Sequence, residues 1–241
     1  MRFFVPPESI RGTHVRFSPE QSRQIARVLR LEPGAAVFVF DNSGWVYTVR
    51  LNQVSPRAVQ GTIVGREKGK ADPPLHVTLY QSLIKGERMD WVLQKGTEVG
   101  ISRFVPMITA RTVVRRYEKR ARWERILVEA TEQSGRARVP ELGDIREFSQ
   151  VIPELSQYHE IFLAHVGEEI PRLRDVIRTR QEPPERVALL IGPEGGFTLE
   201  EVERAQAHSA TIVHLGPRTL RSETAGVVIA SIVLHYWGDL A

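Results

Sequence analysis

The chain has 241 residues and a formal net charge of +4 at neutral pH. This length allows one large domain or a small and a medium one. It contains no cysteine, so disulfide bonds and thiolate metal sites are excluded. Its first residues lack the apolar stretch of a signal peptide, and no apolar run approaches the roughly 20 residues of a membrane-spanning helix. We therefore expect a soluble, cytoplasmic protein with no membrane partner.

The charge is unevenly distributed along the chain. Residues 1–72 hold 11 Lys and Arg against 6 Asp and Glu, a net charge of +5, whereas residues 73–241 hold 22 against 23, a net charge of −1. A polyanion-binding module joined to a near-neutral second module would have this distribution. An ordinary solvated basic surface would also have it, so charge alone leaves both interpretations open.

Residues 1–70 have the pattern of a small β-domain with one helix. Short alternating apolar runs, separated by turn residues such as Asp41–Gly44, predict strands over residues 2–5, 36–40, 45–51 and 58–64. A helix is predicted over Pro19–Leu29, with Ile25, Val28 and Leu29 on one side. This pattern indicates a small β-barrel that includes one helix.

The rest of the chain follows a charged linker, Glu67–Pro74, which contains glycine and two prolines. We place the boundary near Pro73, between a domain at 1–72 and a domain at 73–241. Beyond it, strands are predicted over 75–83, 103–109, 160–166, 187–191 and 211–215, and helices over 86–99, 118–135 and 168–179, after Thr198 and after Ser222. Alternating strands and helices predict a mostly parallel α/β sheet.

Two glycine-bearing loops follow two of these strands. In the first, Gly192–Gly196, the glycines allow a ligand to approach the main chain closely. A helix should begin directly after it, because Thr198 and Glu201 have the spacing of a capping box. Phe197 and Val202 stand where the flanking hydrophobic staple is expected. The start of this helix is therefore well specified.

The second loop, Gly216–Arg221, precedes the last predicted helix, for which Ser222 is the expected N-cap residue. Residues Ala225–Trp237 are apolar nearly all round, so we expect them in the core or at a dimer interface. Open α/β sheets bind ligands at the carboxyl ends of their strands, where both loops should lie. His165 ends a third strand and is either close to a bound cofactor or a hydrogen-bonded histidine at a strand end.

The two loops together, GPEGGFT at 192–198 and LGPRTLRSETA at 215–225, resemble the SPOUT class of knotted methyltransferases. Within this class the chain resembles the family that methylates N3 of a uridine in small-subunit ribosomal RNA. Similar stretches occur in the same order over essentially the whole chain, at Arg2–Val5, Arg27–Leu31, Lys85–Asp90 and Glu129–Ser134. The sequence departs from the family pattern at Gln24, Thr219 and Ser222.

The resemblance implies an α/β SPOUT domain with a trefoil knot and a small N-terminal PUA-like barrel. It also implies S-adenosyl-L-methionine as cofactor, 16S ribosomal RNA of the small ribosomal subunit as partner, a homodimer and no metal. The residues expected to bind the cofactor are His165, Leu190, Ile191, Gly192, Pro193, Glu194, Gly195, Gly196, Leu215, Gly216, Leu220, Arg221, Glu223 and Ala225.

Methylation of uracil N3 requires loss of the N3 proton, and the negative charge then spreads onto the two carbonyl oxygens. A cation beside these oxygens would stabilise the charge. Arg221, just past the second loop, is the first candidate for this catalytic role. Glu132 is a candidate proton acceptor, and Glu194 or Glu223 could do the same.

Four arginines are expected to bind RNA. Arg27 and Arg30, in the first domain, are expected to contact phosphates, because a guanidinium group binds phosphate through two parallel hydrogen bonds. Arg136 and Arg138 follow the helix predicted at 118–135, and the family resemblance implies that they belong to a surface that meets the target uridine. Each of them could instead be an ordinary solvated arginine.

Rival functions remain open. A SPOUT enzyme that methylates a ribose 2′-hydroxyl of transfer RNA would share the glycine loops, although the basic first domain and the second loop argue against it. A non-catalytic RNA-binding protein of ribosome assembly would keep the fold without turnover, although the intact loop glycines argue against it. The loops could also be ordinary turns or a nucleotide-phosphate site, but no Walker lysine follows the first.

Overall fold

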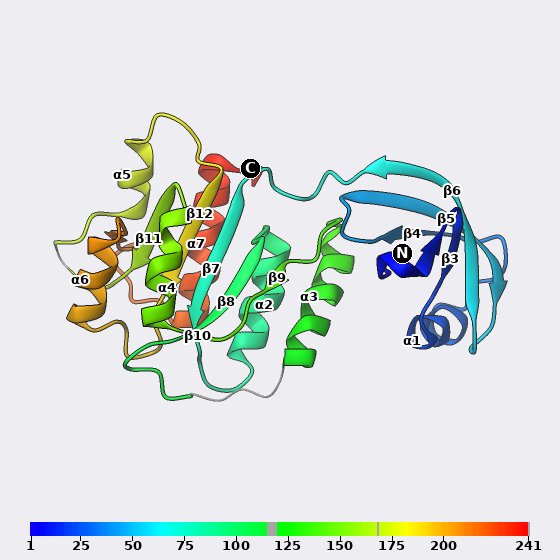
Figure 1. The fold of residues 1–241 in the computed structure, drawn as a ribbon, viewed down its shortest axis with the longest axis horizontal. Coiled ribbons are helices and arrows are strands. Elements are labelled where there is room, and N and C mark those ends of the chain that lie inside the picture. The colour runs from blue at the N-terminus through cyan, green and yellow to red at the C-terminus, as the bar shows by residue number, and fades with distance from the viewer. Residues whose placement is uncertain (115–119, 168, 241) are drawn as a thin grey trace. The chain divides into compact units, whose positions relative to one another are not determined.

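The computed structural model describes residues 1–114, 120–167 and 169–240 of the chain, which forms two compact units (Figure 1). The first unit comprises Met1–Asp72 together with Thr131–Val139, and the second comprises Pro73–Ala130 together with Pro140–Ala241. Residues 131–139, which the sequence analysis placed in the second domain, therefore belong to the first unit. Within the described ranges, no helix is long and apolar enough to cross a bilayer.

The first unit is built on a six-stranded sheet with the order β1-β4-β5-β6-β3-β2. Its strands are β1 (Arg2–Phe4), β2 (Ile10–Arg11), β3 (His14–Arg16), β4 (Ala36–Phe40), β5 (Trp45–Val54) and β6 (Val59–Lys68). Only β1 and β4 pair in parallel. Because the end strands β1 and β2 do not pair with each other, the predicted barrel is observed as an open sheet. The sequence analysis missed β2 and β3, which are too short to show an alternating pattern.

The helical segment of the first unit differs from the predicted helix in its second half. It starts as α1 (Pro19–Arg23) with a capping box and continues as a π-helical turn, η2 (Gln24–Val28). The wider turn rotates the following side chains relative to an α-helix. Ile25 is fully buried in the core of the unit, whereas Val28, predicted on the same side, is 74% exposed.

The segment Thr131–Val139 is held in the first unit by polar contacts. The Glu132 Oε1 atom accepts a hydrogen bond of 2.8 Å from the backbone N–H of Phe4, on the edge strand β1. The Nε atom of Arg136 donates to Asp72 Oδ1 at 3.0 Å, and the Arg136 side chain is only 4% exposed. The contact of Arg136 with RNA stays a prediction, and its buried, paired charge does not favour it.

The second unit is a seven-stranded sheet with the order β10-β8-β7-β12-β11-β13 and β9 beside β8, and all these pairs are parallel. Its strands are β7 (His76–Ser82), β8 (Arg103–Ile108), β9 (Glu141–Leu142), β10 (Arg146–Glu147), β11 (Glu160–Ala164), β12 (Arg186–Ile191) and β13 (Thr211–Val213). This parallel sheet confirms the predicted α/β fold.

Helices cover both faces of this sheet (Figure 1). They are α2 (Arg88–Val99), α4 (Phe148–Glu154), α5 (Leu173–Arg178), α6 (Leu199–Ala207) and α7 (Ser222–Trp237). A further helix, α3 (Arg120–Ser134), begins in this unit, and its last residues belong to the first unit. The last helix, α7, lies against α2, β7 and β12, so the prediction that it packs on more than one neighbour is confirmed. The sequence analysis missed α4. Residues 118, 119 and 168, included in predicted helices, lie outside the described residues.

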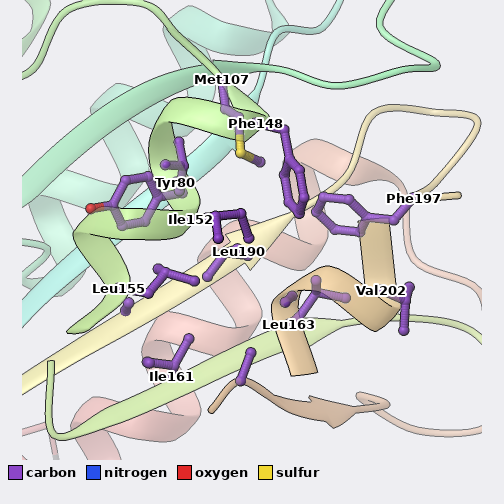
Figure 2. Close-up of a cluster of buried hydrophobic side chains, with 14 of the residues drawn as sticks. Tyr80, Met107, Phe148, Ile152, Leu155, Ile161, Leu163, Leu190, Phe197 and Val202 are labelled. Atoms are coloured by element: carbon purple, nitrogen blue, oxygen red, sulfur yellow. The ribbon is translucent and has the colours of Figure 1, made fainter. Parts of the chain in front are cut away.

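A cluster of buried apolar side chains joins the sheet to α4 and α6 (Figure 2). Tyr80, Leu163 and Leu190 come from three neighbouring strands, and the rings of Phe148 and Phe197 lie 5.8 Å apart. Burying one such side chain contributes about 1.5–3 kcal/mol. Since Phe197 directly follows the first glycine loop, this cluster anchors that loop to the core.

We expect Arg136→Ala to destabilise the first unit by about 3–5 kcal/mol, because it leaves the Asp72 carboxylate without its buried partner. Urea denaturation followed by circular dichroism measures the effect. The matched control is Arg57→Ala, which removes the same charge from an exposed position of the same unit. Equal stability of the two variants would show that the Arg136–Asp72 pair does not hold the segment.

Candidate functional site

A cavity of about 1020 Å³ opens at the carboxyl ends of β11, β12 and β13. Three chain segments form most of its wall, namely 164–167, 191–196 and 214–222. This volume lies at the upper end of the range for small-molecule sites, and its position is where parallel sheets bind ligands. The expectation that the two glycine loops lie at one edge of the sheet is therefore confirmed.

The first loop is fixed by contacts from the chain that follows β8. The Nη1 atom of Arg111 donates to the carbonyl oxygen of Gly195 at 2.7 Å. The buried Glu201 accepts the N–H of Ala110 at 2.8 Å with Oε1 and the N–H of Thr198 at 2.9 Å with Oε2. The predicted capping box of Thr198 and Glu201 is confirmed. Its glutamate thus also ties the loop to the chain that follows β8, two strands away in the sheet.

Glycine is required in both loops by backbone conformation. Gly196 has a φ of +68° and Gly216 a φ of +134°, in the left-handed region that other residues rarely adopt. No atom lies within 4 Å of where a Cβ would stand at either position. The main chain at both glycines is therefore open to a ligand.

Ser222 has a different role from the predicted one. The N-cap residue of α7 is Arg221, and Ser222 is the first residue of the helix. Its buried hydroxyl donates a hydrogen bond to the carbonyl of Gly192 and accepts one of 2.8 Å from Gln81 Nε2. The hydroxyl thus connects the end of β7, the first loop and the start of α7.

Arg88 connects the first loop to α7 through two carboxylates. Its Nη1 atom lies 3.1 Å from Glu194 Oε1, and its Nε atom lies 3.7 Å from Glu223 Oε1. Arg88 lines the cavity, and the sequence analysis did not single it out. The side chain of Glu223 is only 13% exposed, and its Oε2 atom has no hydrogen-bond partner among the described residues.

Two polar groups at the cavity differ in their surroundings. Burial, together with the positive charge of Arg111, lowers the pKa of His165 below its usual value of 6.5. Arg221 is exposed at the cavity wall, and its side chain makes no hydrogen bond or ion pair with the described part of the chain. The cavity therefore combines a histidine that favours its neutral form with an unpaired cation.

The residues predicted to bind a cofactor line this cavity, with two exceptions. Leu190 is fully buried on the face of β12 that packs against α4 and α6 (Figure 2). Glu223 does not line the cavity and faces Arg88. Arg172 and His214, which meet in an isolated parallel bridge, were missed because no local pattern marks them.

The remaining predicted residues lie in the first unit. Arg27, Arg30 and Arg138 are exposed there, and their contact with RNA stays a prediction. Arg138 also donates from Nη1 and Nη2 to the carbonyls of Asn42 and Ser43 at 3.0 and 3.1 Å.

Residues 71–234 match the sequence family described as RNA methyltransferase domain. The ribosomal RNA small subunit methyltransferase E of Bacillus subtilis is 32% identical over 227 residues, which cover 90% of this chain and 88% of the relative. The chain belongs to the ribosomal RNA small subunit methyltransferase E family. The Aquifex aeolicus family member is 31% identical over 87% of this chain and 90% of its own.

A solved structure of the family has the same fold. The Neisseria gonorrhoeae ribosomal RNA small subunit methyltransferase E, bound to S-adenosyl methionine, superposes with a TM-score of 0.89 at 31% identity. The match covers 100% of this chain and 99% of that one.

We expect Ser222→Ala to destabilise the second unit by about 1–3 kcal/mol, because the Gly192 carbonyl and the Gln81 amide lose a buried partner. Ser222→Thr keeps the hydroxyl and should restore most of the loss. The control is Ser231→Ala on the same helix, since Ser231 bonds only to the Val227 carbonyl of that helix. This role would be contradicted if thermal denaturation gave Ser222→Ala and Ser231→Ala the same melting temperature.

The lowered pKa of His165 predicts a pH-dependent stability. Protonation of His165 costs more free energy in the folded than in the unfolded state. The folded state therefore has its full stability above pH 6.5, and part of this stability is lost as the pH falls through the folded-state pKa of His165. His165→Asn should therefore lose less stability than the wild type between neutral and mildly acidic pH. Urea midpoints at both conditions test this, with the exposed His14→Asn as control. Equal losses of stability in the wild type and in His165→Asn between the two pH values would contradict this prediction.

Proposed function

We propose that this protein transfers a methyl group from S-adenosyl-L-methionine to N3 of a specific uridine of 16S ribosomal RNA in the small ribosomal subunit. The observation that carries the proposal is the cavity between the two glycine loops, in a chain of the ribosomal RNA small subunit methyltransferase E family. The structural relative bound to S-adenosyl methionine supports the choice of cofactor.

The residues of the cavity fit this cofactor. The open main chain at Gly196 and Gly216 would hold its adenine and ribose, and the apolar wall includes Ile191, Leu215 and Leu220. When bound, S-adenosyl-L-methionine supplies a methyl group activated by a positively charged sulfur. The anchored loops would hold the reacting groups in line, and alignment of this kind contributes about 7–11 kcal/mol.

Two charged groups would handle the charge of the uracil ring. Arg221, exposed and unpaired among the described residues, would stabilise the negative charge that develops on the carbonyl oxygens. Of the proposed proton acceptors, Glu194 lines the cavity, whereas Glu223 does not and its Oε2 atom is buried. Glu194 shares Arg88 with Glu223, and Glu132 is already bonded to the N–H of Phe4. Glu132 thus remains the weaker candidate.

The proposal includes the architecture implied by the family resemblance. The second unit would be a SPOUT domain in which α7 closes a trefoil knot, and the first unit would be a PUA-like RNA-binding domain. Arg27, Arg30 and Arg138 would contact phosphates of the RNA. The protein would act in the cytoplasm as a homodimer, with the apolar α7 near the interface.

The test is transfer of labelled methyl from S-adenosyl-L-methionine to small ribosomal subunits from a strain that lacks this gene, followed by nucleoside chromatography. We expect one N3-methyluridine product. Arg221→Ala should lower kcat at least about 100-fold, as loss of one transition-state donor does, without weakening cofactor binding measured by calorimetry.

Arg218→Ala serves as the matched control, because Arg218 is a second exposed arginine of the same loop. It should retain most of the activity. A ribose-methylated product, or no transfer to small subunits, would refute the N3-uridine proposal and favour the transfer-RNA or non-catalytic alternative.

A further inference from the structure

An exposed tryptophan stands at the open end of the β5–β6 hairpin in the first unit. Trp45 is the first residue of β5 and pairs with Lys68, the last residue of β6. The indole ring is 38% exposed, and the guanidinium carbon of Arg66 lies 4.9 Å from its centroid. This distance is typical of a cation–π contact, which fixes the orientation of the ring. An aromatic side chain is thus held in place at the surface with more than a third of its area open.

Cations without ion-pair partners lie on the strand that pairs with Trp45 and just after it. Arg66, Lys68 and Lys70 are all exposed, and none of them forms an ion pair with a described residue. The backbone N–H of Gly69 donates to the carbonyl of Gly44 at 2.8 Å, so this part of the chain passes directly beside the residue that precedes Trp45. Arg66 and Lys68 therefore lie beside the indole, and Lys70 follows two residues after Lys68 in the chain.

No described carboxylate forms an ion pair with these three cations, and Asp72, two residues after Lys70, is paired with Arg136. The Asp41 carboxylate accepts hydrogen bonds from Ser43 and from the hydroxyl of Tyr47. Glu67 alternates with Arg66 and Lys68 along β6, so its side chain points to the opposite face of the sheet. The surface around Trp45 is thus both aromatic and positively charged.

We propose that Trp45, Arg66, Lys68 and Lys70, together called the Trp45 platform, bind unpaired RNA. A base would stack on the indole, and the three cations would bind the flanking phosphates. Aromatic rings beside free cations are the general means by which proteins bind single-stranded nucleic acid. The inference rests on the proposed function and deepens it, because a uridine that reacts at N3 must itself be unpaired.

The charge of the unit supports RNA over a protein partner as the occupant. The first unit carries a net charge of +6, counting both of its chain segments, which favours a polyanion. The stacked ring and the free cations require a ligand that offers flat aromatic groups and negative charges at short intervals. A single RNA strand offers both in each nucleotide.

The experiment measures binding of the full-length protein to a fluorescein-labelled single-stranded oligouridylate of about 12 nucleotides, a length within the range of such sites. Fluorescence anisotropy gives the affinity. Trp45→Ala should weaken binding about tenfold, the effect of one lost base stack, and Trp45→Phe should weaken it less. The control is Phe38→Ala, which removes an aromatic ring of similar exposure, 41%, from the same sheet.

The phosphate contacts are tested separately by the salt dependence of binding. The double variant Lys68→Ala, Lys70→Ala should reduce the slope of log K against log salt by about 1.4, because each contact to a single strand contributes about 0.7. Arg57→Ala is the control, since Arg57 is exposed in the turn at the other end of the same hairpin. It should leave the slope unchanged.

The proposal is refuted if Trp45→Ala binds the oligouridylate with the same affinity as Phe38→Ala. It is also refuted if the double lysine variant has the same slope of log K against log salt as Arg57→Ala. Methyl transfer by the wild-type protein separates this failure from failure of the proposed function. Transfer with unchanged RNA affinity in Trp45→Ala would refute only the platform. Absence of both transfer and cofactor binding in the wild type would refute the function itself.

Discussion

The geometry of the cavity depends on the buried hydroxyl of Ser222. It bonds to the carbonyl of Gly192 and to the amide of Gln81, so it ties the start of α7 both to the first loop and to β7. The close approach of α7 to β7 at this point requires a glycine one helical turn after Ser222, because a Cβ at Gly226 would lie 2.6 Å from Gln81 Oε1. The two glycine loops are therefore fixed on opposite sides of one cavity by a single polar group and a close helix–strand contact.

The first loop is held in the same way from its other side. Phe197 is buried among the apolar side chains between the sheet and α4 (Figure 2), while Arg111 binds the Gly195 carbonyl. Arg88 joins this loop to the first turn of α7 through Glu194 and Glu223. A loop with anchors of this kind is ordered before any ligand arrives, so little binding free energy is lost in ordering it.

The sequence predicted those parts of the structure that depend on neighbouring residues. The strands and most helices of the second unit follow from apolar periodicity, and the capping box of Thr198 and Glu201 follows from a spacing of three residues. Most residues of the cavity wall were found because both loops follow strands of one parallel sheet. Ser222 was misassigned because a hydroxyl at a helix start has the same local pattern whether it caps that helix or bonds to a distant carbonyl.

Contacts between distant residues could not be predicted. Arg136 was expected to bind RNA, and its partner within the chain, Asp72, lies 64 residues earlier. Arg88 and Glu194 are separated by 106 residues, so nothing near Arg88 in the sequence indicates that it bridges two segments of the site. An arginine in a polar stretch has the same local pattern whether its charge is solvated, buried or part of a cavity wall. Only the fold distinguishes these cases.

The two units differ in net charge, and this difference bears on which unit attracts the RNA strand and which acts on a single base. The first unit carries +6 and the second −2, and at physiological salt an exposed charge acts over only about 8 Å. The near-neutral second unit can therefore add little general attraction for RNA. In the cavity, Arg88 is already paired with two carboxylates, so under the proposed function Arg221 would be the group that acts on the charge of one base. Affinity for the RNA strand and chemistry on the base would then depend on different residues, and each could change by substitution without the other.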